Sequence, residues 1–196
     1  MWSGLKTAKE KGKKMDSEQI EYLTKDDPFL KKYANFIVFD HEIPSILPMN
    51  TIYFILLTNG QIKKTPEKQY DLGHWCILET LPYNNKSESK YGIGYFDPLG
   101  TPCNPLIRKK IVTTAKTYGL KVFINKTQVQ LKIATVCGLF STLVILLRAR
   151  KYSYAEILGK KLSKSPRVNA MVVPDLISSL LPKTLKKLER FSIDFI

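Results

Sequence analysis

Short runs of β-branched and aromatic residues between positions 36 and 124 predict β-strands. The runs are Phe36–Phe39, Thr51–Thr58, His74–Thr80, Tyr91–Phe96 and Lys121–Ile124. An Asn59-Gly60 pair ends the second run as a turn, and the polar stretch PYNNKSESK separates the third run from the fourth. We therefore expect a sheet of short strands, with PYNNKSESK as a surface loop.

A helical period replaces the strand pattern in NPLIRKKIVTTAKTYG, residues 104–119. Asn104 is suited to the N-cap and Pro105 to the first helical position, while Gly119 is suited to ending the helix. The predicted apolar stripe consists of Ile107, Ile111, Ala115 and Tyr118. This segment predicts an amphipathic helix that packs one face on the sheet.

A second helix is expected to begin near Cys137, in CGLFSTLVILLRARK. Its residues are apolar almost all round, which is typical of a buried helix. The cations at its end, Arg148, Arg150 and Lys151, suit the negative end of a helix dipole. The pattern predicts the central, buried helix of the fold.

The remaining helices are predicted from caps and prolines. Asp16 and Gln19 have the spacing of a capping box and start a short helix. Near the C-terminus, short helical patterns are separated by Pro166, Pro174 and Pro182 and lead to KTLKKLER, which we expect as a surface helix.

The length of 196 residues predicts one domain with a real core, which we place at residues 16–196. Residues 1–15 carry five lysines and almost nothing to bury, and predict a basic, flexible arm. The alternative for this arm is a merely solvated tail.

The charge balance is strongly basic, with 31 Lys and Arg against 17 Asp and Glu and a net charge of +14. Such an excess predicts attraction to nucleic acid or another polyanion, mainly through salt-sensitive phosphate contacts. Basic segments at 6–14, 108–110, 160–167 and 183–190 either line one face or are scattered over the surface.

Cysteine spacing and hydropathy exclude several classes of protein. The three cysteines show neither CxxC nor HxxxH spacing, so we expect no disulfide scaffold, no metal site and no cofactor. The first residues, MWSGLKTAKEKGKKM, are basic without an apolar segment behind them, so no secretory signal is expected. The longest apolar run, near Leu143–Leu147, is too short for a bilayer, and no membrane contact is expected.

Cys137 is a candidate nucleophile because a thiol at a helix N-terminus is stabilised as thiolate by the dipole and by unpaired backbone N–H groups. A buried core cysteine is the ordinary alternative. A thiolate also needs an imidazole, and the chain has only two. His74 begins a strand in GHWCIL, whereas His41 lies in the polar segment FDHEIP. The more rigid position favours His74.

The imidazole needs an acceptor that orients it, and Asp97 in YFDPLG ends the neighbouring strand. An aspartate that merely starts a turn is the alternative. Acyl transfer also needs donors for the oxyanion, one of which can be a side-chain amide. Gln130 and Gln128 are both candidates at this point.

His74, Asp97, Gln130 and Cys137 stand in the order His, Asp, Gln, Cys, within the motifs HW, DPLG and Q-x6-CGLF. This order and these motifs resemble the adenovirus maturation (adenain-like) proteases and their relatives in virophages and Polinton-like elements. SUMO-specific proteases of the same peptidase clan, CE, share the order more distantly. The resemblance is clearest over residues 73–147.

The resemblance implies an α+β fold, in which a mixed β-sheet flanked by helices carries the histidine and the acid. The cysteine would stand at the N-terminus of a buried central helix. Carried over residue by residue, it makes Cys137 the nucleophile, His74 the base, Asp97 the orienting acid and Gln130 the oxyanion donor. The seven-residue spacing to the cysteine selects Gln130 over Gln128.

In function, the resemblance implies a viral cysteine endopeptidase that cleaves capsid and core precursor proteins during virion maturation. We expect a monomer in the virion and in the infected host cell, in a cytoplasmic virus factory or the nucleus. DNA stimulates the adenovirus enzyme, which suits the +14 charge here. The adenovirus enzyme also joins an activating peptide through a cysteine just upstream of the strand before its glutamine. This chain has no cysteine there, so no covalent peptide is expected.

Two alternatives stay open. One is a protease that removes SUMO or ubiquitin from host proteins. The other is a catalytically inert, basic DNA-binding virion protein on a protease scaffold, in which the thiol has no special reactivity.

Overall fold

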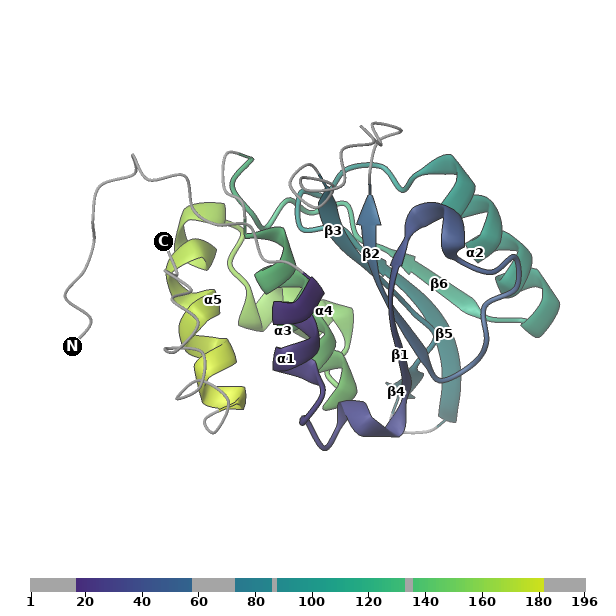
Figure 1. Cartoon of the computed structure of the whole chain (residues 1–196), viewed down its shortest axis with the longest axis horizontal. Helices are drawn as coiled ribbons and strands as arrows, with labels where there is room; N and C mark the ends of the chain where they lie inside the picture. The colour runs from purple at the N-terminus through teal and green to yellow at the C-terminus, as the bar shows by residue number, and fades with distance from the viewer. Residues whose placement is uncertain (1–16, 58–72, 86–87, 133–135, 182–196) are drawn as a thin grey trace.

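A mixed β-sheet with helices on both faces forms the core of the protein (Figure 1). The computed structural model describes residues 17–57, 73–85, 88–132 and 136–181. Its strands are β1 (Ala34–Phe39), β2 (Thr51–Leu57), β3 (His74–Glu79), β4 (Pro82–Asn85), β5 (Glu88–Phe96) and β6 (Lys121–Ile124). The pairs β1–β2 and β5–β6 are parallel, whereas β2–β3, β3–β5 and β4–β5 are antiparallel. The predicted α+β class with a mixed sheet is confirmed.

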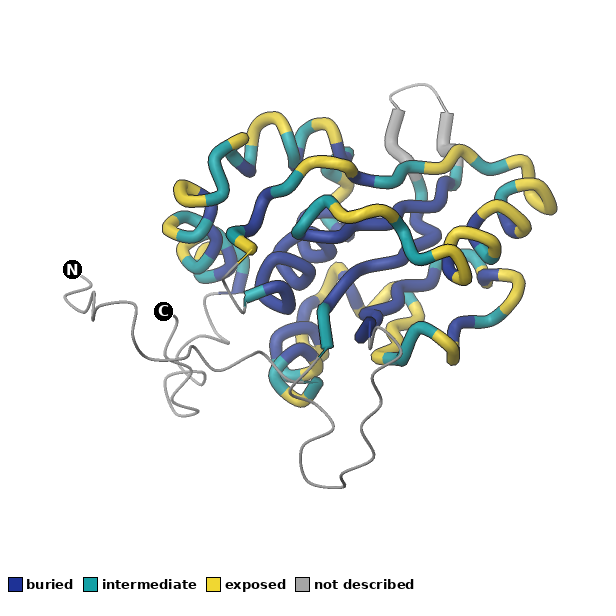
Figure 2. The backbone as a smooth tube through the Cα atoms, turned by 90° about the horizontal axis from the view of Figure 1, so that it is seen from above, coloured by how far each residue is buried: buried dark blue, intermediate teal, exposed yellow. Residues whose placement is uncertain are grey.

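Alternating side chains divide the core into two halves, one on each face of the sheet. Phe54 of β2 and Ile77 of β3 point to one face, and Ile55 and Leu78 point to the other. The central strands have buried side chains on both faces, as the dark tube through the middle of Figure 2 shows. This double burial explains why β2 and β3 read as nearly continuous apolar runs.

Helices cover both faces of this sheet. On one face lie α1 (Ser17–Thr24), α3 (Cys137–Ala149) and α5 (Pro166–Leu180). On the other face lies α2 (Pro105–Tyr118). Shorter elements connect them: η1 (Leu30–Lys32), η2 (Asp40–Glu42), α4 (Tyr154–Glu156) and η3 (Ile157–Lys161).

Every residue of α3 is buried, as its apolar sequence predicts. The helix packs on β3 and lies between that strand and α5. The prediction of a central buried helix that begins at Cys137 is confirmed. Among the described residues, no helix is both long and apolar enough to cross a membrane.

The predicted caps of α2 are confirmed. The Asn104 side chain accepts a hydrogen bond from the Leu106 N–H at 2.8 Å, and Gly119 has a φ of 65° at the C-terminal end. The predicted stripe is wrong at Tyr118, which is 50% exposed. Thr114 is buried instead, because its hydroxyl accepts a hydrogen bond from the Leu47 N–H.

Two predictions of chain organisation are wrong. The stretch PYNNKSESK is not a loop, because most of it belongs to a hairpin in which Pro82 pairs with Tyr91 and Asn85 with Glu88. Backbone pairing in such a hairpin needs no apolar side chains, so the polar sequence conceals it. Pro174 does not separate two helices either, since α5 continues through it. A proline inside a helix removes one backbone hydrogen bond, and burial of Val173 and Ile177 holds the helix despite this loss.

Several predicted features lie outside the described residues. They are the basic arm at 1–15, the Asp16 cap, the Asn59-Gly60 turn and the helix in KTLKKLER.

A buried ion pair ties β3 to α3. The Arg148 Nε donates to Glu79 Oε1 at 3.0 Å, and both side chains are at most 1% exposed. Glu79 Oε2 also accepts the Leu81 N–H at 2.7 Å. Burial raises the pKa of Glu79, and Arg148 together with the Leu81 N–H opposes this rise. Arg148 thus acts inside the core, in addition to standing near the end of a helix.

Gly94 of β5 leaves room for this ion pair. A Cβ at Gly94 would stand 2.5 Å from Glu79 Oε1 and 2.4 Å from the Tyr154 hydroxyl. We expect Gly94→Ala to lower the free energy of unfolding by about 1–3 kcal/mol through overpacking. Urea denaturation measures this loss. Gly159→Ala is the matched control, because no atom of the described residues lies within 4 Å of a Cβ there. An equal loss in both variants would contradict the packing argument.

Candidate active site

The candidate site forms where β3 begins and β5 ends. His74 is the first residue of β3, and Asp97 follows the last residue of β5. The two strands are antiparallel, with Ile77 paired to Phe96, so the start of one lies beside the end of the other. Sheet geometry therefore brings together two residues that are 23 positions apart.

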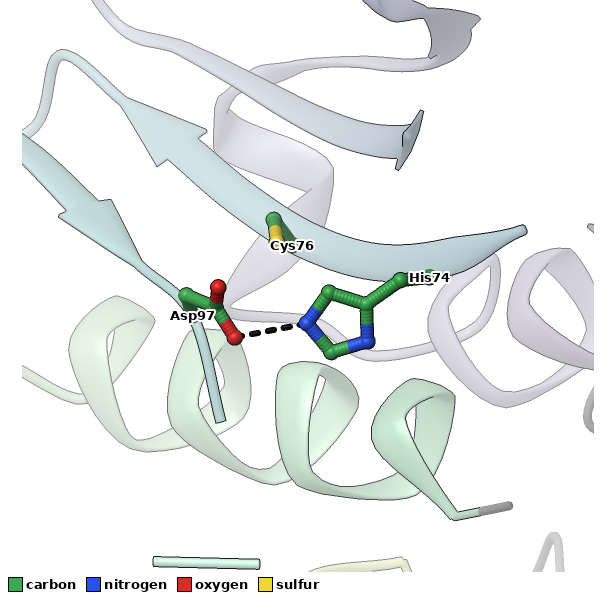
Figure 3. Close-up of side chains that lie close together, drawn as sticks. All are labelled: His74, Cys76 and Asp97. Carbon is green, nitrogen blue, oxygen red and sulfur yellow. Dashed lines mark hydrogen bonds and ion pairs between the residues drawn. The ribbon is translucent and has the colours of Figure 1, made fainter. Parts of the chain in front are cut away.

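His74 and Asp97 are in direct contact. The His74 Nε2 donates to Asp97 Oδ1 at 2.6 Å, while the second ring nitrogen points away from Asp97 (Figure 3). The Asp97 side chain is fully buried, and that of His74 is 19% exposed. This is the arrangement of an imidazole whose orientation is fixed by a carboxylate.

The turn DPLG holds the Asp97 carboxylate in place. Oδ1 also accepts the Leu99 N–H at 2.8 Å, and Oδ2 accepts the Thr101 hydroxyl. The turn is closed by the Gly100 N–H, which donates to the Asp97 carbonyl. Gly100 has a φ of 66°, and a Cβ there would lie 2.7 Å from the Gln128 nitrogen. Glycine is thus required for the turn and for the close approach of the next segment.

Charge is stabilised on both members of the pair. Burial alone lowers the pKa of His74, but hydrogen bonds with Asp97, Cys137 and Cys76 outweigh it and raise the pKa to about 12. Burial alone raises the pKa of Asp97, but the hydrogen bond and charge of His74, with the Thr101 and Leu99 donors, lower it. We therefore describe the pair as imidazolium and carboxylate at neutral pH.

Cys137 stands at the first position of α3, where the residue is 7% exposed and its thiol lies against β3. Its Sγ accepts the Trp75 N–H at 3.4 Å. One turn later, the Ser141 hydroxyl donates to the Trp75 carbonyl at 3.1 Å. The backbone of the residue next to His74 thereby fixes the start of α3, and hydrogen bonding with Cys137 contributes to the raised pKa of His74.

Gln130 is buried beside the same turn. Its backbone N–H donates to the Pro98 carbonyl at 3.1 Å, which ties the segment after β6 to the residue following Asp97. Its relative exposure is 2%. The competing Gln128 is only half-buried, and its side-chain amide donates to the Gln130 carbonyl at 2.8 Å. Burial near the turn favours Gln130, whose role as an oxyanion donor stays a prediction.

The structure brings His74, Asp97 and Cys137 together and leaves His41 outside the cluster. The His41 side chain is 57% exposed, near Asp40, and stacks on Phe39. The choice of His74 over His41 agrees with this geometry. The catalytic roles themselves stay predictions.

Comparison with known proteins adds little to this geometry. No family model matches the chain, and no curated protein matches it. A solved structure of the ASFV pS273R protease is similar with a TM-score of 0.40 and 17% identity, over 64% of this chain and 42% of that chain. Its selenomethionine form has a TM-score of 0.41 and 15% identity, over 56% and 38%. The matches span about two fifths of those proteins, and similarity this weak carries no argument about function.

Sequence reasoning missed two residues of the site. The Asn125 side chain accepts the Asp97 N–H at 2.7 Å and donates to the Asp97 carbonyl at 2.9 Å, so it clamps the backbone of the acid. An asparagine directly after a strand was the available signal. Cys76 lies beside His74 and Asp97 (Figure 3). Its signal was the His-x-Cys spacing, which puts both side chains on one face of a strand.

Proposed function

We propose that this protein is a cysteine endopeptidase. The observation that carries the proposal is the position of the His74 ring, between the buried Asp97 carboxylate and the Cys137 thiol at the start of a helix. A thiol, an imidazole and an orienting acid in this arrangement are the parts of nucleophilic acyl transfer.

In the proposed mechanism, the His74 imidazolium stabilises the Cys137 thiolate. The thiolate attacks the carbonyl carbon of a peptide bond and forms a tetrahedral oxyanion. His74 then gives its proton to the leaving amine, and a thioester remains on Cys137. Water, deprotonated by His74, attacks the thioester, releases the new carboxyl terminus and restores the thiol–imidazole pair. Asp97 keeps the ring oriented and its positive charge stable throughout.

The oxyanion would be bound by the Cys137 backbone N–H and the Gln130 amide. The Cys137 N–H is a suitable donor because Cys137 is the first residue of α3, and N–H groups of a first helical turn have no partner within their helix. The Gln130 amide is a suitable second donor because Gln130 is buried and its backbone N–H is fixed to the Pro98 carbonyl. Donors that are held in place before the reaction are the ones that stabilise such charge effectively.

For the substrate we propose viral capsid and core precursor proteins, cleaved in the virion and infected cell. The motif resemblance supports this class. The net charge of +14 supports non-specific binding to nucleic acid, with DNA as a stimulating partner. The alternative enzymatic activity is removal of SUMO or ubiquitin from proteins. The alternative without catalysis is an inert DNA-binding virion protein.

A substrate-independent digestion tests the proposal. Peptides from a digested cell proteome are incubated with the wild-type protein and with Cys137→Ala, with and without duplex DNA, and new N-termini are counted by mass spectrometry. We expect cleavage by the wild type and none by Cys137→Ala, since the variant has no nucleophile.

Other outcomes of this experiment would contradict the proposal or favour one of the two alternative functions. Cleavage that persists in Cys137→Ala contradicts the proposed nucleophile. Absence of peptide cleavage together with processing of SUMO or ubiquitin fusions favours the deconjugating activity. DNA binding without any cleavage favours the inert virion protein.

A further inference from the structure

Cys76 is a buried thiol that the proposed mechanism does not use. It lies two residues after His74 on β3, so the two side chains share one face of the strand. Continuing the pairing of Ile77 with Phe96 by one step sets Cys76 across from Asp97. One donor atom from each of His74, Cys76 and Asp97 lies within 4.8 Å of the others (Figure 3).

Nitrogen, sulfur and carboxylate oxygen together form a typical ligand set for zinc, with three protein ligands and one open position. Around a tetrahedral Zn²⁺, neighbouring donor atoms stand about 3.3–3.6 Å apart, given the usual metal–ligand distances. The His74–Asp97 contact of 2.6 Å would have to open to about 3.3 Å, and any pair of donor atoms near the 4.8 Å limit would have to close. Both changes would be side-chain adjustments of residues on the neighbouring strands β3 and β5.

We propose that His74, Cys76 and Asp97 form an inhibitory binding site for a thiophilic divalent cation such as Zn²⁺. The cation takes the lone pair of His74 Nε2, a carboxylate oxygen of Asp97 and the thiolate of Cys76. The protons of the Cys76 thiol and of Nε2 leave to solvent. That inhibition follows rests on the proposed function, because a metal-bound His74 cannot serve Cys137 as base.

The surroundings of the cluster suit such an ion. The Leu99 N–H and the Thr101 hydroxyl already orient the Asp97 carboxylate, as outer partners of metal ligands do. Cys76 and Asp97 are fully buried, whereas His74 is 19% exposed, so the ion and a water as fourth ligand would enter beside the ring.

A protein with one thiol tests the site directly. The chain has three cysteines, so Cys103→Ser/Cys137→Ala retains only Cys76. Titration of this variant with Co²⁺, followed by Zn²⁺, is monitored by absorbance. We expect one equivalent of Co²⁺ to give a thiolate-to-cobalt charge-transfer band, which Zn²⁺ then removes by displacement. Adding Cys76→Ser should abolish the band and weaken Zn²⁺ binding by about 100-fold or more, since even outer partners contribute about 10–100-fold.

His41→Ala in the same background is the matched control, and its band should be unchanged. Absence of the band in the one-thiol protein would overturn the site, as would Zn²⁺ binding that is insensitive to Cys76→Ser or that requires Cys137. These outcomes are independent of proteolysis. A protein that binds Zn²⁺ through Cys76 but cleaves nothing keeps the site and loses the proposed function. A protease that ignores Zn²⁺ keeps the function and loses the site.

Discussion

Replacing His74 by glutamine is expected to slow alkylation of Cys137 by about 100-fold near pH 6.5, because the proposed mechanism activates the thiol through the imidazole, and such acid–base activation contributes about 100-fold or more. In the wild type, the imidazolium stands beside the thiol. The raised pKa of His74, about 12, keeps the ring charged over the neutral range, so the wild-type ring presents a positive charge to the Cys137 sulfur. Glutamine retains similar bulk but carries no charge.

The measurement is iodoacetamide modification, followed by mass spectrometry in a Cys103→Ser background. Cys103 is half-buried and so more exposed than Cys137, although burial raises the pKa of Cys103 to about 12. His41→Gln is the matched control and should react like the parent. Equal alkylation rates for His74→Gln and its parent would contradict the proposed ion pair and would indicate that Cys137 is an ordinary buried core cysteine.

The largest expected effect on stability is that of Arg148→Met. This change leaves the buried Glu79 carboxylate without its cation, and loss of one partner from a buried pair costs about 3–5 kcal/mol of unfolding free energy. Thermal and urea denaturation measure it. Lys116→Met, at an exposed position on α2, should stay within about 0.5 kcal/mol of the wild type.

The loss should also depend on pH. Burial raises the pKa of Glu79 above 4.5 in the folded protein, and removal of Arg148 raises it further. A group with a raised folded pKa contributes stability that is fully present below its unfolded pKa and is lost as the pH rises through the folded value. The deficit of Arg148→Met is therefore larger at neutral pH than in weak acid. Adding Glu79→Gln should recover part of it at neutral pH, and a double variant no better than the single one would contradict this account.

The sequence predicts those parts of the fold that depend on local chemistry. The bounds of α2 are predictable because its capping residues, Asn104 and Gly119, act on the first and last turns of the same helix. Burial on both faces makes β2 and β3 readable as apolar runs. The polar β4–β5 hairpin was not predictable in this way, because its pairing is made by backbone groups.

The site was predicted in part for a similar reason. His74, Asp97 and Cys137 carry motif signals, whereas Asn125 acts through a backbone clamp that becomes visible only once β6 lies beside β5. The absence of CxxC and HxxxH spacing gives no sign of a metal site at Cys76. Its position across from Asp97 follows only from the register of β3 and β5. From the sequence, Arg148 is predicted to interact with the dipole of its own helix, whereas its partner in the structure is Glu79, 69 positions away.

The two hydrogen bonds between Trp75 and the start of α3 imply that the amount of folded protein and the geometry of the candidate site in each folded molecule can change independently. Because the Trp75 N–H meets Cys137 and its carbonyl meets Ser141, the helix cannot slide along β3 without losing both contacts. Trp75 thus sets the spacing between His74, the proposed base, and Cys137, the proposed nucleophile. A substitution that weakens distant packing should lower abundance in the cell, while every molecule that does fold retains full specific activity.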